Sequence, residues 1–86
     1  MGAVAKDIKL ADGSTVHMDI SELRRRDWED FWNGVEGENR IIAKFTNLTI
    51  EEVKDMLDRD FQQLTREFIK LRNKPLDDPN SPSAST

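Results

Sequence analysis

The stretch IIAKFTNLTIEEVKDML, residues 41–57, decides the fold of this chain. Its apolar residues recur at spacings of three and four on either side of a central FTNLT, which predicts two amphipathic helices joined by a tight turn. Asn47 in that turn tolerates the left-handed conformation in which helices end. Thr49, followed three residues later by Glu52, forms a capping box and predicts the start of the second helix. Such a corner serves either as a DNA-reading helix-turn-helix or as a packing corner inside a protein-binding domain.

The charge of the second helix disfavours DNA. A recognition helix lies in the major groove beside phosphates, where an acidic helix is repelled. Lys54 is the one basic residue in this stretch, which carries the four carboxylates of Glu51, Glu52, Asp55 and Asp58. The one basic run, 24–26, is followed at helical spacing by acidic residues that neutralise much of its positive charge. We therefore expect no nucleic-acid partner and keep a small DNA-binding regulator as the alternative function.

The clearest helix follows this corner, over residues 59–73. Its apolar residues repeat with spacings of four and three, which makes a heptad-like seam. The seam consists of Leu57, Phe61, Leu64, Phe68 and Leu71. It spans about two heptads, too few for a stable coiled coil by itself. Pro75 ends the helix, and the Pro/Ser-rich segment 76–86 has no periodicity, which predicts a disordered tail.

The N-terminal part predicts a β-hairpin over residues 4–20. Asp12-Gly13 is a strong hairpin turn signal, and Val16, Met18 and Ile20 alternate with polar residues after it. An isolated hairpin is marginally stable in water. We therefore expect the apolar face of this hairpin to lie on the helices or to extend a sheet in a partner.

A helix over residues 22–33 should follow the hairpin, with Ser21 as its N-cap. Its apolar residues fall at i, i+3, i+4 and i+7, which makes one aromatic stripe. The stripe consists of Trp28, Phe31, Trp32 and Val35. Gly34 and Gly37 should then break the helix before the next one begins.

Together these elements predict an α+β fold that is mainly α, with an N-terminal β-hairpin packed on three to four short helices. We expect a single small domain over residues 1–75 and a disordered tail over 76–86. The predicted elements are the hairpin 4–20 and helices at about 22–33, 38–46, 50–57 and 59–73.

The composition argues against an enzyme. The 86 residues make one small domain that cannot easily house a deep active site. The chain has no cysteine, one histidine (His17, on the polar face of a predicted strand), and no nucleophile motif, phosphate loop or metal-ligand spacing. We expect no catalytic residues, no metal and no cofactor. The formal net charge of −4 disfavours anionic membranes, and no apolar run reaches the about 20 residues of a membrane span.

The aromatic stripe and the seam are the best candidates for contact with a protein partner. Tryptophan is over-represented at interface hot spots, although core packing explains the same pattern. The predicted partner-binding residues are Trp28, Phe31, Trp32, Leu64, Phe68 and Leu71. A hairpin with two free edges and a heptad-like helix are also compatible with a homo-oligomer.

The order of these features resembles a known family. The strand pair around Leu-x-Asp-Gly-Ser, the Ser-Glu-Leu helix start, the run Ile-Ile-Ala-x-x-Thr-Asn-Leu-Thr-x-Glu-Glu-Val, and Asp-Phe-x-x-Leu-x-x-x-Phe are similar to tailed-bacteriophage tail assembly chaperones of the Mu and P2 type. The resemblance covers roughly residues 8–71. The family often has glycine where this chain has Asn47, and the run 24–26 and the two tryptophans are not part of its pattern.

The resemblance implies a non-enzymatic role. Such chaperones bind the tape measure protein, keep its long hydrophobic helices soluble, and help the major tail tube protein to polymerise around it. They act in the cytoplasm of the bacterial host, encoded by a phage or prophage, and are usually absent from the mature virion. The resemblance therefore predicts the tape measure protein as the main partner of this chain.

Overall fold

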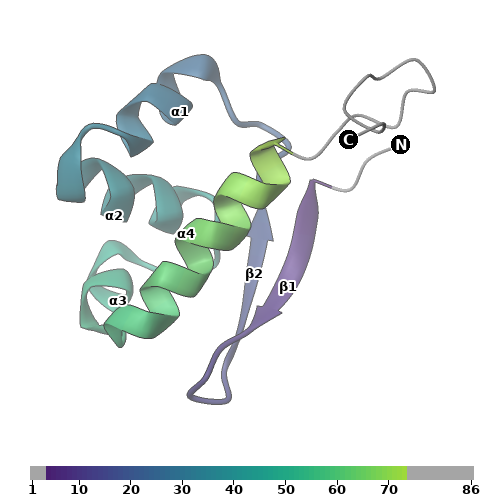
Figure 1. The fold of residues 1–86 in the computed structure, drawn as a ribbon, viewed down its shortest axis with the longest axis vertical. Coiled ribbons are helices and arrows are strands. Elements are labelled where there is room, and N and C mark those ends of the chain that lie inside the picture. The colour runs from purple at the N-terminus through teal and green to yellow at the C-terminus, as the bar shows by residue number, and fades with distance from the viewer. Residues whose placement is uncertain (1–3, 74–86) are drawn as a thin grey trace.

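The computed structural model describes residues 4–73, which form a two-stranded antiparallel sheet followed by four helices (Figure 1). The elements are β1 (Ala5–Lys9), β2 (Thr15–Asp19), α1 (Arg25–Phe31), α2 (Gly34–Lys44), α3 (Ile50–Asp55) and α4 (Asp58–Asn73). This confirms the predicted fold class, a hairpin packed on short helices. The predicted tail, 76–86, lies outside the described residues.

The hairpin turns at the predicted position. Gly13 has φ of 94°, which favours glycine, and the carboxylate of Asp12 accepts hydrogen bonds from the backbone N–H (2.8 Å) and hydroxyl (2.6 Å) of Ser14. The register pairs Ile8 with Val16 and Asp7 with His17. Because side chains alternate across a strand, Ile8, Val16 and Met18 face inward and are buried, and the outer face carries mostly polar groups.

The turn after α2 covers the free edge of β2. The amide of Asp19 donates to the carbonyl of Phe45 (2.9 Å), Met18 forms a bridge with Thr46, and the amide of His17 donates to Oδ1 of Asn47 (3.3 Å). These contacts hold the turn alongside the sheet. The expectation of a left-handed Asn47 was therefore wrong: within residues 4–73, positive φ occurs only at Gly13 and Gly34.

The capping box at the corner is confirmed. The hydroxyl of Thr49 accepts from the amide of Glu52 (3.1 Å), and the Glu52 carboxylate accepts from the amide of Thr49 (2.8 Å). These two hydrogen bonds satisfy donors that the first turn of a helix leaves free. The helix that they start is short and ends at Asp55, two residues before the predicted end.

The boundaries around the first two helices differ from the prediction. Ser21 does not cap α1, because its amide donates to the Asp19 carboxylate (2.9 Å) in a turn that leads out of the sheet. The helix begins at Arg25 instead, with the carboxylate of Asp27 accepting from the Arg24 amide (3.0 Å). Gly37 does not break a helix either, since α2 already begins at Gly34.

A single core lies between the sheet, α1, α2 and α4. In Figure 1, α4 runs diagonally across the molecule, with the hairpin on one side and α1 to α3 on the other. Its buried side chains meet apolar residues from both sides. Polar contacts tie α4 to the hairpin, because Lys6 pairs with Glu67 (2.7 Å) and the amide of Ala11 donates to buried Asp60 (3.1 Å). The fully buried centre includes Phe31, Phe68, Met18, Ile42, Leu64 and Val16.

Candidate functional site

The six predicted partner-binding residues divide between the core and the surface. Phe31, Leu64, Phe68 and Leu71 are buried, so partner contact through them would require the core to open. They are part of the hydrophobic core and lie on the inward faces of α1 and α4. Trp28 is half-buried, and Trp32 is 59% exposed. Only the two tryptophans among the six therefore offer substantial surface to a partner.

Trp28 is held by rings on three sides. Its ring stacks on Phe31 at a centroid distance of 6.0 Å, meets Trp32 edge-on at 5.6 Å, and lies 5.8 Å from Phe68 of α4. The Arg72 guanidinium lies 4.4 Å from its centroid, within the range of a cation–π contact. The aromatic stripe is thus anchored on the core at Phe31 and Phe68 and reaches the surface at Trp32.

A cleft of about 220 Å³ opens beside Trp28, between the start of α1 and the end of α4. We call it the arginine cleft. It is lined by Leu23, Arg24, Arg25, Trp28 and Arg72. Arg25 lies 3.4 Å from Glu29, whereas Arg24 and Arg72 form no ion pair with a carboxylate of residues 4–73. Tryptophan and arginine are both residue types that are enriched at interface hot spots.

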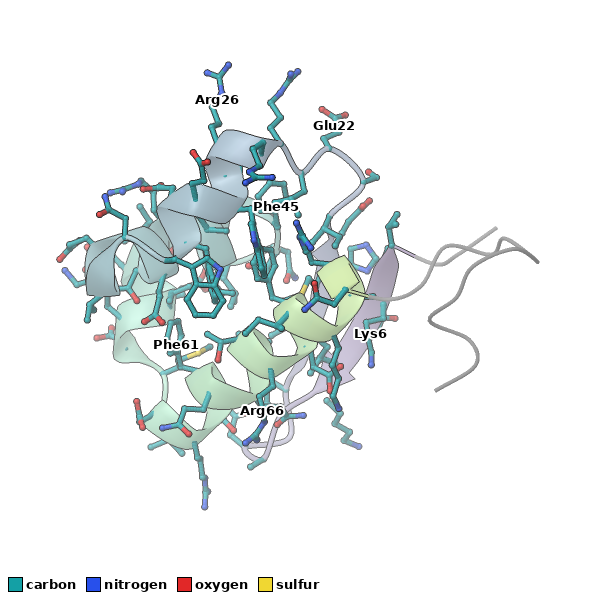
Figure 2. The ribbon with its side chains drawn as sticks, turned by 45° about the horizontal axis from the view of Figure 1, so that its top comes forward. Lys6, Glu22, Arg26, Phe45, Phe61 and Arg66 are labelled. Carbon is teal, nitrogen blue, oxygen red and sulfur yellow. The ribbon has the colours of Figure 1, made fainter. Side chains whose placement is uncertain are left out.

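A second cleft, of about 450 Å³, lies between α2, α3 and the start of α4. We call it the corner cleft. It is lined by Val35, Glu38, Asn39, Val53, Lys54, Met56, Asp58 and Phe61. Figure 2 shows Phe61 on the side of α4 that faces α2 and α3. Val35 is 69% exposed, the most open of the large apolar side chains described.

The two clefts are separate and lie beside α4, one near each of its ends, and the surface made up of the two clefts and the two tryptophans is here called the α4 groove. Arg72 borders it near the end of α4 and Phe61 near the beginning. On the opposite side, Trp28 lines the first cleft, Val35 lines the second, and Trp32 connects them along the chain. The sequence placed Trp28, Trp32 and Phe61 on apolar faces, but nothing in the sequence indicated that Arg72 and Leu23 would join them.

Two ion pairs join α1 to α2, and both helices contribute residues that line the α4 groove. The Lys44 ammonium donates to Asp27 (3.0 Å), which is 5% exposed, and the Arg40 guanidinium donates two hydrogen bonds to Asp30 (2.9 and 2.7 Å). Burial raises the pKa of Asp27, but the hydrogen bonds from Lys44 and Arg24 outweigh it, so the pKa lies below its ordinary value. The hydrogen bonds from Arg40 likewise lower the pKa of Asp30.

These shifts predict a loss of stability in acid. A carboxylate whose folded-state pKa is depressed stabilises the protein above its unfolded pKa, about 3.9 for aspartate, and this contribution is lost as pH falls through the folded pKa. We expect the Tm to be nearly constant above about pH 5 and to fall below about pH 4. Asp27→Asn should lower the Tm at neutral pH and flatten this fall, as measured by thermal unfolding between pH 7 and pH 2.

The matched control is Asp55→Asn, which removes an exposed carboxylate with no ion pair among residues 4–73. It should leave both the neutral Tm and the acid slope close to those of the wild type. If Asp27→Asn keeps the full acid slope, the buried carboxylate is not a source of the pH dependence. Some slope should remain in either variant, because hydrogen bonds from Ser14 and Ser21 lower the pKa values of Asp12 and Asp19.

The only histidine gives no sign of catalysis. His17 Nδ1 lies 2.8 Å from Asp7 Oδ1 on the outer face of the sheet, and both side chains are more than half exposed. A catalytic dyad needs a nucleophile or substrate proton within hydrogen-bond reach, and Asp7 is the only partner of the His17 ring among the described side chains. Within residues 4–73 no three His, Cys, Asp or Glu side chains gather as a metal site would require.

The helix that would read DNA presents the wrong charge. Its residues Glu51, Glu52 and Asp55 are exposed, with Lys54 as its one cation. A phosphate backbone would meet net negative charge on this surface.

No helix within residues 4–73 is long and apolar enough to cross a membrane. No protein-family model, curated protein or solved structure matches this chain.

Proposed function

We propose that this protein is a tail assembly chaperone of a tailed bacteriophage, which binds a helical segment of the tape measure protein without catalysing a reaction. The observation that carries the proposal is the α4 groove, where Trp32 and Val35 expose apolar surface next to open clefts. The motif resemblance described above supplies the identity of the client. The groove supplies a surface on which such a client could bind.

A groove of this kind suits an amphipathic helix. Helix-in-groove recognition needs an apolar floor and a few projecting anchors spaced along one helix face. Trp28 and Phe61 provide the floor, and Trp32 and Val35 provide the anchors. Tryptophan buries 150–250 Å² in a core, so covering the exposed part of Trp32 removes about 100 Å² from water and contributes about 2–3 kcal/mol.

In this proposal the protein acts in the host cytoplasm, before tail completion. It covers apolar helices of the tape measure protein until the major tail tube protein assembles around them, and it is then released and absent from the mature virion. The acidic surface supports this role, because a net charge of −4 keeps a complex with an apolar client from self-associating. Nucleic acid is not a partner in this scheme.

Co-expression with the tape measure protein from the same phage tests the proposal. We expect the client to move from the insoluble to the soluble fraction and to co-elute with this protein on size exclusion. An unrelated acidic protein of similar size serves as the control and should leave the client insoluble. If the client's solubility is unchanged and no complex co-purifies, the proposed function is wrong.

A further inference from the structure

The α4 groove carries opposite charges at its two ends. At the end of α4 it is bordered by Arg24, Arg25 and Arg72. At the start of α4 it is bordered by Glu38 and Asp58, with Lys54 as the only cation in that cleft. Figure 2 shows Arg26, the last residue of the basic run, projecting outward from the start of α1. One end of the groove therefore carries three arginines, of which Arg25 lies 3.4 Å from Glu29, whereas the lining of the other end has a net charge of −1, in a protein that is acidic overall.

The length of the groove matches about three turns of helix. Phe61 and Arg72 lie eleven positions apart on α4, which corresponds to about 16 Å at 1.5 Å per residue. On the opposite wall, Trp28 lies on α1, Trp32 at the C-cap of α1 and Val35 at the start of α2. An apolar stripe on a docked helix would cover these anchors with two to three side chains on one face.

We propose that the groove selects an amphipathic helix with an acidic first turn and a basic last turn, and binds it antiparallel to α4. The acidic turn lies in the arginine cleft and the basic turn at Glu38 and Asp58. The inference rests on the proposed function, in that a helical client is bound, and it adds which class of helix binds and in which direction.

Two independent effects favour this direction. The first is side-chain charge, since the reversed helix would place its cations against Arg25 and Arg72. The second is the helix dipole, because the C-terminal end of α4 is partly negative and attracts the positive N-terminus of a neighbouring helix. In an antiparallel pair the two effects act together. They also match the ordinary design of helices, which carry acidic residues in the first turn and basic residues in the last.

The test uses two synthetic peptides of about 14 residues with the same composition and the same leucine stripe, each stapled on its polar face so that both are helical. The forward peptide has glutamates in its first turn and lysines in its last, and the reversed peptide exchanges them. Binding is measured by the change in the intrinsic fluorescence of Trp28 and Trp32. The reversed peptide can match the charges of the groove only by docking parallel to α4, against the helix dipole, so we expect the forward peptide to bind about two- to fivefold more tightly at low salt, and the ratio to approach one at about 1 M salt.

Charge reversal at one end provides a matched pair of variants. Arg25→Glu should abolish or invert the preference, because Arg25 lines the arginine cleft. Arg66→Glu changes the net charge equally, but Arg66 is exposed on α4 and lines neither cleft, so the preference should be retained. The same affinity for both peptides, or the same loss of preference in both variants, would overturn the inference. So would tighter binding of the reversed peptide.

The outcomes separate this inference from the proposed function. If neither peptide binds while the tape measure protein still co-purifies, the groove is not the client site and the chaperone function stands. If the forward peptide binds but the tape measure protein does not co-purify, the groove and its polarity stand and the chaperone function fails. Light scattering of the free protein identifies a second copy as occupant, and concentration-dependent self-association that blocks peptide binding would count against a foreign helix.

Discussion

Replacing Phe68 with alanine should remove about 3–5 kcal/mol from the free energy of unfolding, the usual cost of truncating a buried phenylalanine. Phe68 is fully buried on α4, and its ring lies 4.7 Å from Phe31, 5.8 Å from Trp28 and 6.3 Å from Phe45. It therefore joins two rings of α1 and one ring from the turn after α2 on the opposite side of the core. Small domains are stable by about 5–15 kcal/mol, so Phe68→Ala should leave a marginal fold. Urea unfolding followed by circular dichroism measures the loss.

Phe61→Ala is the matched control on the same helix. Phe61 is only half-buried and lines the corner cleft, so its truncation should cost clearly less, about 1–2 kcal/mol. If the two variants lose the same stability, the division of α4 into a core face and a groove face is incorrect. If Phe68→Ala leaves stability unchanged, Phe68 does not lie in the core.

Gly37→Ala should also destabilise the protein, by about 1–3 kcal/mol, although alanine is the better helix former. The reason is the contact between α1 and α2. A Cβ atom at Gly37 would lie 1.9 Å from the backbone carbonyl oxygen of Asp30 and 3.1 Å from its carbon, so one helix would have to move away from the other. Such a shift would strain the Asp30–Arg40 and Asp27–Lys44 pairs that join the same helices.

The sign of this effect makes the test decisive. In an exposed helix, glycine to alanine raises stability by about 1 kcal/mol. Glu36→Ala, at the neighbouring exposed position of α2, should change stability by less than about 0.5 kcal/mol. A Gly37→Ala variant with raised Tm would show that α1 and α2 do not approach as closely as described. Thermal unfolding of the three proteins side by side is sufficient.

The elements with strong local signals could be predicted from the sequence. Helix α4 begins at Asp58, within one residue of the expected start, because an amphipathic repeat over many residues outweighs any local ambiguity. The hairpin follows from Asp12-Gly13, where the required backbone conformation is available to few residues other than glycine. Thr49 and Glu52 identified the start of α3 because a capping box is a local hydrogen-bond pattern.

The errors in the predicted helix boundaries and turn conformation arose where tertiary contacts determine the local structure. Glycine in a helix is usually read as a break, but Gly37 is required by the backbone of α1, which is not adjacent to it in sequence. Asn47 could have ended a helix in the left-handed conformation, but its side chain bonds to the sheet at His17 instead. Ser21 is a good cap by residue type, but the chain is still leaving the sheet there, and α1 begins only at Arg25.

Only part of the candidate site could be predicted from the sequence, because tertiary contacts also determine which apolar side chains are buried. Periodicity identifies apolar faces but cannot tell which part of a face the rest of the protein covers. Phe68 and Trp32 looked alike in sequence, yet one is in the centre of the core and the other is 59% exposed. Val35 was assigned to the same helical stripe as the tryptophans. It lies instead on the next helix, and the chain turn at Gly34 brings it to the corner cleft.

The central claim is that a helical client binds to the apolar surface of the α4 groove, and one comparison tests it most directly. The amount of tape measure protein that co-purifies is measured for the wild type, for the double variant Trp32→Ser/Val35→Ser, and for Ile50→Ser, which removes an exposed apolar side chain outside the groove. All three should have helical circular dichroism spectra, since the three side chains are 43–69% exposed. We predict that the wild type and Ile50→Ser retain the client, whereas the double variant loses at least about 90% of it, because it lacks an exposed tryptophan, a residue type enriched at hot spots, and an exposed valine. Equal recovery of the client with a folded double variant would contradict the claim.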